Sequence, residues 1–115
     1  MTAHACRYPL QVKVWADKDN EESGWSNSVL DMDYEVLVVS QFPLHANLKK
    51  GNKPDFHNAM AAGPAREAFD ACVDMYKRLY SPSKIQTGSF GALMKVSLEN
   101  DGPVTFCMEL APPSA

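Results

Sequence analysis

Ser40, Cys72 and Cys107 are the first candidates for a nucleophile. Ser40 is followed by Gln41 and does not lie in a Gly-x-Ser-x-Gly turn, so the sequence carries no nucleophile elbow. Cys72 falls on an apolar helical face and Cys107 alternates toward solvent or a neighbour, and free cysteines usually behave as small hydrophobic residues. A cysteine–histidine pair stays open on spacing alone, but packing and incidental exposure account for both cysteines more simply.

Metal and phosphate chemistry find little support in the sequence. The histidines share no short ligand spacing, and neither a His-Glu-x-x-His motif nor a paired-cysteine motif occurs. The segment from Gly88 to Gly91 has too few glycines for a dinucleotide fingerprint. We therefore expect no metal and no cofactor. The histidines in question are His4, His45 and His57.

The composition is that of an ordinary soluble globular protein. Hydrophobic residues make up 45% and charged residues 22% of the 115 residues, which excludes a disordered or fibrous chain and suits one domain. The net charge of −3 does not indicate a nucleic-acid binder, so any RNA contact would need a local basic patch. The one dense basic cluster consists of Lys49, Lys50 and Lys53.

The same sequence predicts a cytoplasmic protein with no membrane partner. No apolar run is long enough to cross a bilayer, and residues 1–8 lack the apolar core of a signal peptide. The cysteines are odd in number and widely spaced, so a disulfide framework is not expected.

Hydrophobic periodicity predicts one helix, over residues 63–80. Pro64 suits the first turn of a helix, and Pro82 lies just beyond its expected end. A single apolar face would be formed by Phe69, Cys72, Val73, Tyr76, Leu79 and Tyr80.

Four strands are expected to accompany this helix. The continuous apolar run inside residues 34–42 predicts a central strand that is covered on both faces. Alternating apolar residues predict further strands over residues 8–15, 92–98 and 104–110, and polar loops over residues 17–27 and 45–58. The outline is α+β, with a core thin enough that extra strands or a partner subunit are expected.

Two segments closely resemble the signatures of a known family. Val38-Val39-Ser40-Gln41-Phe42-Pro43-Leu44 resembles the Ser-Gln-Phe-Thr-Leu signature of D-aminoacyl-tRNA deacylases, with Pro43 in place of the threonine. Asn100-Asp101-Gly102-Pro103-Val104-Thr105 matches the Asn-x-Gly-Pro-Val-Thr signature of that family at every fixed position. Residues 50–57 and 88–94 also look like family segments in the right order, so the similarity extends from about Leu10 to Leu110.

The resemblance implies a fold and an assembly. The expected fold is a mixed, folded, barrel-like sheet with one main helix packed on it, formed by residues 1–115 as a single domain that lacks the amino-terminal strands of the family. The expected assembly is a homodimer in which a cis Gly102-Pro103 peptide inserts into the active site of the partner. Its backbone carbonyls would accept hydrogen bonds from the substrate ammonium group and exclude an L side chain.

The resemblance also implies roles for particular residues. Ser40, Gln41 and Phe42 would be catalytic, with the serine and glutamine positioning the ester rather than abstracting a proton. Substrate binding is implied for Gly102, Pro103, Phe90, Met94 and Thr105. Phe42 and Phe90 would shape an adenosine pocket by stacking, although burial in a plain core is an equal alternative. Lys49, Lys50 and Lys53 would contact the acceptor end of tRNA or else form a solvated loop.

The implied function is hydrolysis of the ester bond of D-aminoacyl-tRNA, and also of glycine mischarged on tRNA. The products would be a free amino acid and tRNA. The alternative is a catalytically impaired relative that binds tRNA without turnover, which the loss of a hydroxyl and an N–H donor at Pro43 and the short amino terminus favour. An unrelated α+β domain with chance motifs is a third interpretation.

Overall fold

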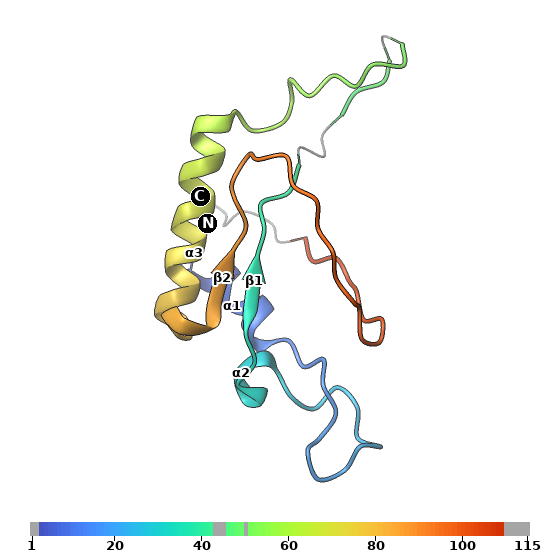
Figure 1. Ribbon diagram of the computed structural model, residues 1–115, viewed down its shortest axis with the longest axis vertical. Coiled ribbons are helices and arrows are strands. Elements are labelled where there is room, and N and C mark those ends of the chain that lie inside the picture. Colours follow the sequence, from blue (N-terminus) through green and yellow to red (C-terminus); the bar gives the residue numbers. More distant parts are fainter. Residues whose placement is uncertain (1–2, 43–45, 50, 110–115) are drawn as a thin grey trace.

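The computed structural model describes residues 3–42, 46–49 and 51–109 (Figure 1). In chain order the elements are α1 (Ala3–Gln11), α2 (Val29–Met32), β1 (Val36–Val38), α3 (Ala62–Leu79), the short 3-10 helix η1 (Pro82–Lys84) and β2 (Ile85–Thr87). The mixed helix and strand content that the sequence predicts is confirmed. Among the described residues, no helix has the length and apolar character needed to cross a membrane.

Helix α3 is the main helix, and its predicted position is confirmed to within one residue at each end. Its apolar residues recur at helical spacing, so one face packs inward with Cys72, Val73 and Tyr76 buried. Lys77 and Arg78 lie in the last turn, where cations interact favourably with the carboxyl end of the helix dipole. The predicted packing role of Cys72 is confirmed.

Strands β1 and β2 form a parallel pair, and α3 lies in the connection between them. The register places Val36 beside Ile85 and Val38 beside Thr87. A parallel pair needs a long crossover, which the helix supplies. Leu37 is 63% exposed, so the expectation that this strand is covered on both faces is wrong: α3 covers one face, and no described residue covers the other.

A small core joins the three helices to the sheet. Its buried members are Leu10, Val29, Cys72, Val73, Tyr76 and Ile85. Helix α2 enters this core through a capping box, in which the Ser28 backbone N–H donates to Asp31 Oδ2 at 2.8 Å and Ser28 Oγ accepts from the Asp31 N–H at 3.3 Å. The backbone hydrogen bond from Ser28 is the main cause that lowers the pKa of Asp31.

The expected strand over residues 8–15 is wrong. Helix α1 continues to Gln11, and the Val12 N–H still donates to the carbonyl oxygen of Tyr8 at 3.0 Å. The physical reason is that Leu10 reaches the core from a helical turn packed against α3, where it is only 2% exposed. Of the residues in this expected strand, only Trp15 forms a β-bridge, an isolated antiparallel one with Asn27. That bridge closes the predicted loop over residues 17–27.

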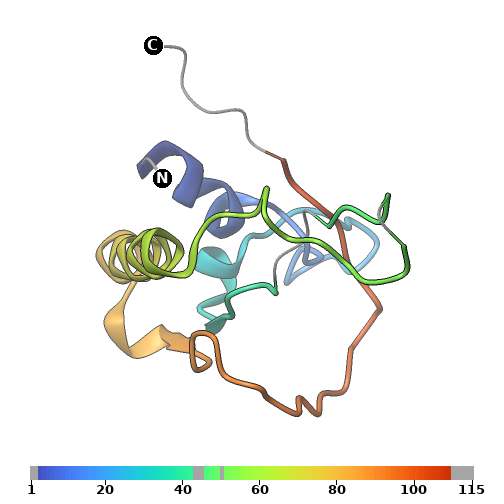
Figure 2. The same ribbon diagram turned by 90° about the horizontal axis from the view of Figure 1, so that it is seen from above.

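Residues 92–109, here called the arm, contain no strand, so the strands expected at residues 92–98 and 104–109 are wrong. The arm runs outward, reverses at residues 100–103 and returns, and Figure 2 shows its orange outward limb arching away from α3 and the sheet. Residues 93–109 make no backbone hydrogen bond to any described residue, which is the physical reason that no strand forms. Leu110, the expected end of the last strand, lies outside the described residues.

The barrel-like sheet that the resemblance implied is not confirmed. The sheet is open and has two strands in the described part of the chain. The radius of gyration is 16.9 Å, whereas a compact chain of this length would have roughly 13 Å, because the arm and the loops extend from the core. The cis peptide expected at Gly102-Pro103 is confirmed.

Candidate substrate-binding site

The candidate site lies where β1 and β2 end, at the carboxyl edge of the parallel sheet. The chain leaves β1 into Ser40, which is half-buried, and then Gln41 and Phe42, which are exposed. A hydrogen bond from the Gly88 N–H to the carbonyl oxygen of Val38, at 3.3 Å, holds the continuation of β2 beside it. Two segments far apart in sequence therefore leave the sheet side by side.

Gly88 allows a close approach at this edge. A Cβ atom added to it would lie 3.4 Å from both Sδ and Cε of Met94 and 3.7 Å from Cγ1 of Val39. Met94 therefore reaches back from the arm to Gly88, which Val39 also approaches. The structure thus brings Met94 to the carboxyl end of β1, close in sequence to Ser40 and Gln41.

One side-chain atom of Gln41 is already hydrogen-bonded. Its Oε1 accepts a hydrogen bond from the Phe42 backbone N–H at 3.2 Å. Because the amide oxygen is used in this way, the two Nε2 hydrogens point to the other side of the group, and both are donors. The arrangement can offer hydrogen bonds to a carbonyl oxygen.

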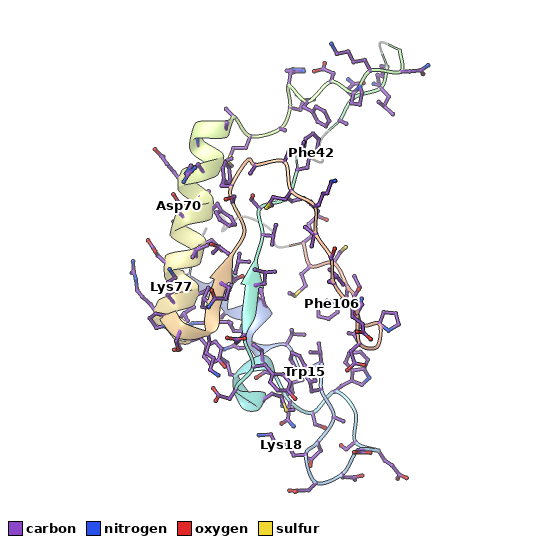
Figure 3. All side chains as sticks on the ribbon, viewed as in Figure 1. Trp15, Lys18, Phe42, Asp70, Lys77 and Phe106 are labelled. Carbon is purple, nitrogen blue, oxygen red and sulfur yellow. The ribbon has the colours of Figure 1, made fainter. Side chains whose placement is uncertain are left out.

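The Phe90 side chain is half-buried against helix α3. Its ring lies 5.6 Å from that of Phe69, and the Arg66 guanidinium carbon lies 5.7 Å from the Phe90 ring centroid. An open pocket of about 550 Å³ lies between this helix and the end of β2. Figure 3 shows two of its lining residues, Asp70 and Lys77, on α3. It is lined by Arg66, Phe69, Asp70, Val73, Asp74, Lys77, Thr87, Gly88, Ser89 and Phe90.

Phe42 is held by a residue from the following loop. Its ring meets that of Phe56 edge to face, with centroids 5.3 Å apart and planes at 88°. An antiparallel bridge between Asn47 and Asp55 closes this loop. Within the loop, the backbone N–H of His57 donates a hydrogen bond to the Asp55 carboxylate, and this bond is the main cause that lowers the pKa of Asp55. The loop thereby contacts the candidate site through Phe56.

Two of the three expected tRNA-contacting lysines are described, and both lie in that loop. Lys49 and Lys53 are exposed, and the Lys49 N–H donates to Asn47 Oδ1 at 2.9 Å. Lys50 and Pro43 lie outside the described residues. The basic residues thus share a loop with Phe56, whose ring touches Phe42.

Gly102, Pro103 and Thr105 lie elsewhere in this chain. The turn of the arm borders a second pocket, of about 590 Å³, whose lining includes Asn100, Asp101 and Trp15. Figure 3 shows Trp15 and Phe42 well apart along the molecule. Within one chain, therefore, the Gly-Pro turn does not meet Ser40 and Gln41.

Phe56 and Arg66 are neighbours of the site that the sequence analysis did not single out. Each acts through a contact with a residue distant in sequence, Phe42 and Phe90 respectively. The only local signal was the position of Phe56 inside the segment over residues 50–57 that looks like the family. No group of three or more His, Cys, Asp or Glu side chains that could hold a metal ion occurs among the described residues.

Comparisons with known proteins agree on one family. The model of the D-Tyr-tRNA(Tyr) deacylase family matches residues 2–109. D-aminoacyl-tRNA deacylase 1 of Mus musculus is 44% identical over 112 residues, which are 97% of this chain and 52% of that protein. D-aminoacyl-tRNA deacylase of Plasmodium falciparum is 41% identical over 100 residues, or 87% of this chain and 59% of that protein.

A solved structure is similar over nearly the whole chain. The c-Myc DNA Unwinding Element Binding Protein superposes with a TM-score of 0.78 at 43% sequence identity, covering 96% of this chain and 71% of that one. The chain spans about half the length of the mouse relative that it matches.

Proposed function

Because this chain belongs to the D-Tyr-tRNA(Tyr) deacylase family, we propose that it hydrolyses the ester bond of D-aminoacyl-tRNA, and also that of glycine mischarged on tRNA. The family resemblance of the sequence is thereby confirmed. The observation that supports the proposal is that Ser40 and Gln41 follow closely after β1 at the edge of the sheet where Gly88 bonds to Val38 and Met94 lies close to Gly88. Such an edge is where parallel sheets commonly bind ligands.

The reaction adds water to the ester carbonyl carbon. The carbon–oxygen bond to the terminal ribose then breaks, and the ribose oxygen leaves with a proton, giving a free D-amino acid and tRNA. An aminoacyl ester is already activated, and its vicinal ribose hydroxyl can assist the water, so no strong side-chain nucleophile is needed. Stabilising the developing oxyanion is then the main task of the protein.

Gln41 and Ser40 suit that task as neutral hydrogen-bonding groups. With its Oε1 held by the Phe42 N–H, Gln41 presents its Nε2 hydrogens as donors to the ester oxygen. The Ser40 hydroxyl lies one residue earlier and is half-buried, so it can hold the substrate without full exposure to water. Both are positioning groups in contact with the substrate.

The aromatic and basic residues suit the acceptor end of tRNA. Phe42 is 69% exposed although Phe56 supports its ring, so an unstacked base can approach it. The Arg66 guanidinium lies near the Phe90 ring, and Asp70 in the same pocket pairs with Arg66 at 3.7 Å, so this pocket offers a stacking surface rather than an excess of positive charge. Lys49, Lys50 and Lys53 would neutralise nearby phosphates.

Stereochemical selection is assigned to Gly102 and Pro103 of a second copy. These residues lie apart from Gln41 within one protomer, so a homodimer is needed to complete the site. Their carbonyl oxygens, with Thr105 beside them, would receive the substrate ammonium group and leave no room for an L side chain.

A binding module without turnover is the second candidate. The open sheet and the unpaired arm of the described residues favour it. Such a protein would bind aminoacyl-tRNA through the same edge without releasing the amino acid.

Deacylation of D-tyrosyl-tRNA and L-tyrosyl-tRNA by the full chain tests the proposal. We expect release from the D-ester alone, with a loss of about 10²–10³-fold in Gln41→Ala if its amide donates to the oxyanion. Gln86→Ala is the matched control, because Gln86 is an exposed glutamine on β2 outside the candidate site. Folded protein that binds the D-ester without releasing tyrosine would favour the module, and equal rates for both esters would overturn stereospecific hydrolysis.

A further inference from the structure

Phe90 lies on a turn whose backbone does not fix the orientation of its ring. The Ala92 N–H donates to the carbonyl oxygen of Ser89 at 3.3 Å, which closes the turn that follows β2. Gly91 within it has φ of 69°, in the left-handed region that glycine adopts readily. Such a turn places the Cα atom of Phe90 but leaves its ring a choice of rotamers. The orientation of the ring therefore depends on the contacts that the ring itself makes.

Helix α3 supplies those contacts from two residues on one face. The Phe69 ring lies 5.6 Å from the Phe90 ring at an angle of 44°, and the Arg66 guanidinium carbon lies 5.7 Å from the Phe90 centroid. Residues three apart on a helix are neighbours on its surface, so both contacts come from the same turn of α3. Phe90 stays half-buried, so part of its ring remains open to the pocket that it lines.

Asp70 orients Arg66 from the next turn of the helix. The Arg66 Nε atom lies 3.7 Å from Asp70 Oδ2, and the two side chains are 62% and 60% exposed. An ion pair so exposed contributes little to stability, so its effect is to restrict the rotamers of a long side chain. A planar guanidinium can face a carboxylate with its edge and an aromatic ring with its plane. Asp70, Arg66 and Phe90 thus form one chain of contacts.

We propose that Arg66, oriented by Asp70, is a positioning residue that holds the Phe90 ring for stacking with the base at the acceptor end of tRNA. This assignment rests on the proposed function and extends it to two helix residues that act through Phe90. Because Asp70 balances the charge of Arg66, the guanidinium serves the ring and not a phosphate. Loss of Arg66 should therefore weaken substrate binding and leave the chemical step unchanged.

Steady-state kinetics of the full chain with D-tyrosyl-tRNA test the role of Arg66. Arg66→Ala should raise KM roughly two- to fivefold, the size of an exposed cation–π contact, with kcat unchanged. Arg78→Ala is the matched control, because Arg78 is an exposed arginine of the same helix outside the pocket lining. A fall in kcat with KM unchanged, or an equal effect of both variants, would overturn the assignment.

Substitutions of Asp70 test whether it acts through Arg66. Asp70→Asn should raise KM in the same direction, Asp70→Glu should recover the original value, and Asp70→Asn should add nothing in an Arg66→Ala background. Glu67→Gln, the same kind of change at an exposed carboxylate outside the pocket lining, is the control. Independent, additive effects of the Asp70 and Arg66 changes would overturn the chain of contacts.

Salt dependence separates positioning from phosphate binding. If Arg66 contacted a phosphate, Asp70→Asn would free the guanidinium and tighten binding. Arg66→Ala would then also reduce the salt dependence of tRNA binding by about one charge. A positioning residue predicts the reverse: weaker binding in Asp70→Asn and an unchanged salt slope in Arg66→Ala. Either phosphate-type result would overturn the proposal.

Two measurements need no turnover. Equilibrium binding of deacylated tRNA should weaken roughly two- to fivefold in Arg66→Ala, as KM does. In the free chain, nuclear Overhauser contacts between the Phe69 and Phe90 rings should weaken in Arg66→Ala and in Asp70→Asn, at an unchanged melting temperature, but not in Arg78→Ala. Ring contacts and tRNA affinity that survive the loss of Arg66 would overturn the proposal. A wild-type chain that hydrolyses no ester would instead overturn the proposed function, and these two measurements would still decide the role of Arg66.

Discussion

The Tyr80 hydroxyl donates a hydrogen bond to the backbone carbonyl oxygen of Tyr34 over 2.8 Å. This bond joins the residue that follows α3 to a residue just before β1. Asp33 supports it, since its Oδ1 lies 3.3 Å from the same hydroxyl and its carbonyl oxygen accepts from Lys84 Nζ at 3.1 Å. The starts of both strands are therefore anchored to one another through the end of the main helix.

Tyr80→Phe is expected to lower stability and to alter its dependence on alkaline pH. Burial, followed by the nearby Asp33 charge, raises the pKa of Tyr80 in the folded state. Because the folded pKa is the higher one, this contribution is fully present below the unfolded pKa of about 10 and is lost as the pH rises through the folded pKa. Thermal melts between neutral and alkaline pH check this, and equal slopes for both proteins would contradict it.

Ile85→Ala should be among the most damaging single changes to the fold. Ile85 is 4% exposed and pairs with Val36 where α3 covers the sheet. Removing such a buried side chain leaves a cavity and costs about 2–5 kcal/mol. Urea unfolding measures the loss, and Leu37→Ala, on the exposed face of β1, should change the free energy of unfolding much less.

Asp31→Asn is expected to lower the folding stability above pH 4 and to reduce the further loss of stability as the pH falls. The hydrogen bonds from Ser28 lower the pKa of Asp31 in the folded state. With the folded pKa depressed, the stability is present above the unfolded value of about 3.9 and is lost as the pH falls through the folded pKa. Acid titration of the melting temperature tests this, and an unchanged profile would show that the capping box contributes nothing.

Phe56→Leu should reduce deacylation through Phe42 rather than through the fold. The edge-to-face contact at 5.3 Å fixes the exposed Phe42 ring, and such pairs contribute about 0.5–1.5 kcal/mol, which corresponds to at most roughly a tenfold loss in kcat/KM. We expect a higher KM with a nearly unchanged kcat, and recovery in Phe56→Tyr. A fall in kcat alone would argue against positioning of the base.

Gly102→Ala should impair the turn of the arm. Gly102 has φ of 138°, which L side chains rarely adopt, and an added Cβ would lie 2.8 Å from the Val104 nitrogen. Because the whole turn is exposed, we expect little change in thermal stability. We expect at least a roughly tenfold loss of D-ester hydrolysis, because raising the activation free energy by about 1.4 kcal/mol already lowers the rate tenfold. Gly24→Ala, where an added Cβ meets open space, is the control, and equal activity of both variants would contradict the role of the turn.

Local periodicity predicted the elements whose partners lie nearby. The helical face from Phe69 to Tyr80 is visible in the sequence because its residues recur every three or four positions, and α3 follows that pattern. Strand β2 gave no such signal, because it is three residues long and only Ile85 is buried.

Alternation in the arm predicted strands, but it could not predict a hydrogen-bonded partner. Val96 and Leu98 alternate as they would in a strand, yet strand formation needs a neighbouring backbone, and none is supplied within the described residues. In the same way, the position of Leu10 is compatible with the spacing of apolar residues in a strand and in a helix, and its packing against α3 selects the helix.

Motifs identified part of the candidate site, and tertiary contacts supplied the rest. Ser40, Gln41 and Phe42 form one contiguous segment, so a family signature could contain them. The ring pairs of Phe42 with Phe56 and of Phe90 with Phe69 join distant segments, and no local spacing encodes them.

The parallel register of β1 and β2 also sets the order in which the molecule can assemble. Val38 and Thr87 become neighbours only after the chain between them, with α3 at its centre, has closed into a loop, and closing so long a loop is entropically costly. Helix α3 can therefore form early, while the hydrogen bond from the Gly88 amide to Val38 forms late. The amide proton of Gly88 should then exchange with solvent deuterium whenever the two strands separate, which makes it a reporter of the intact sheet edge.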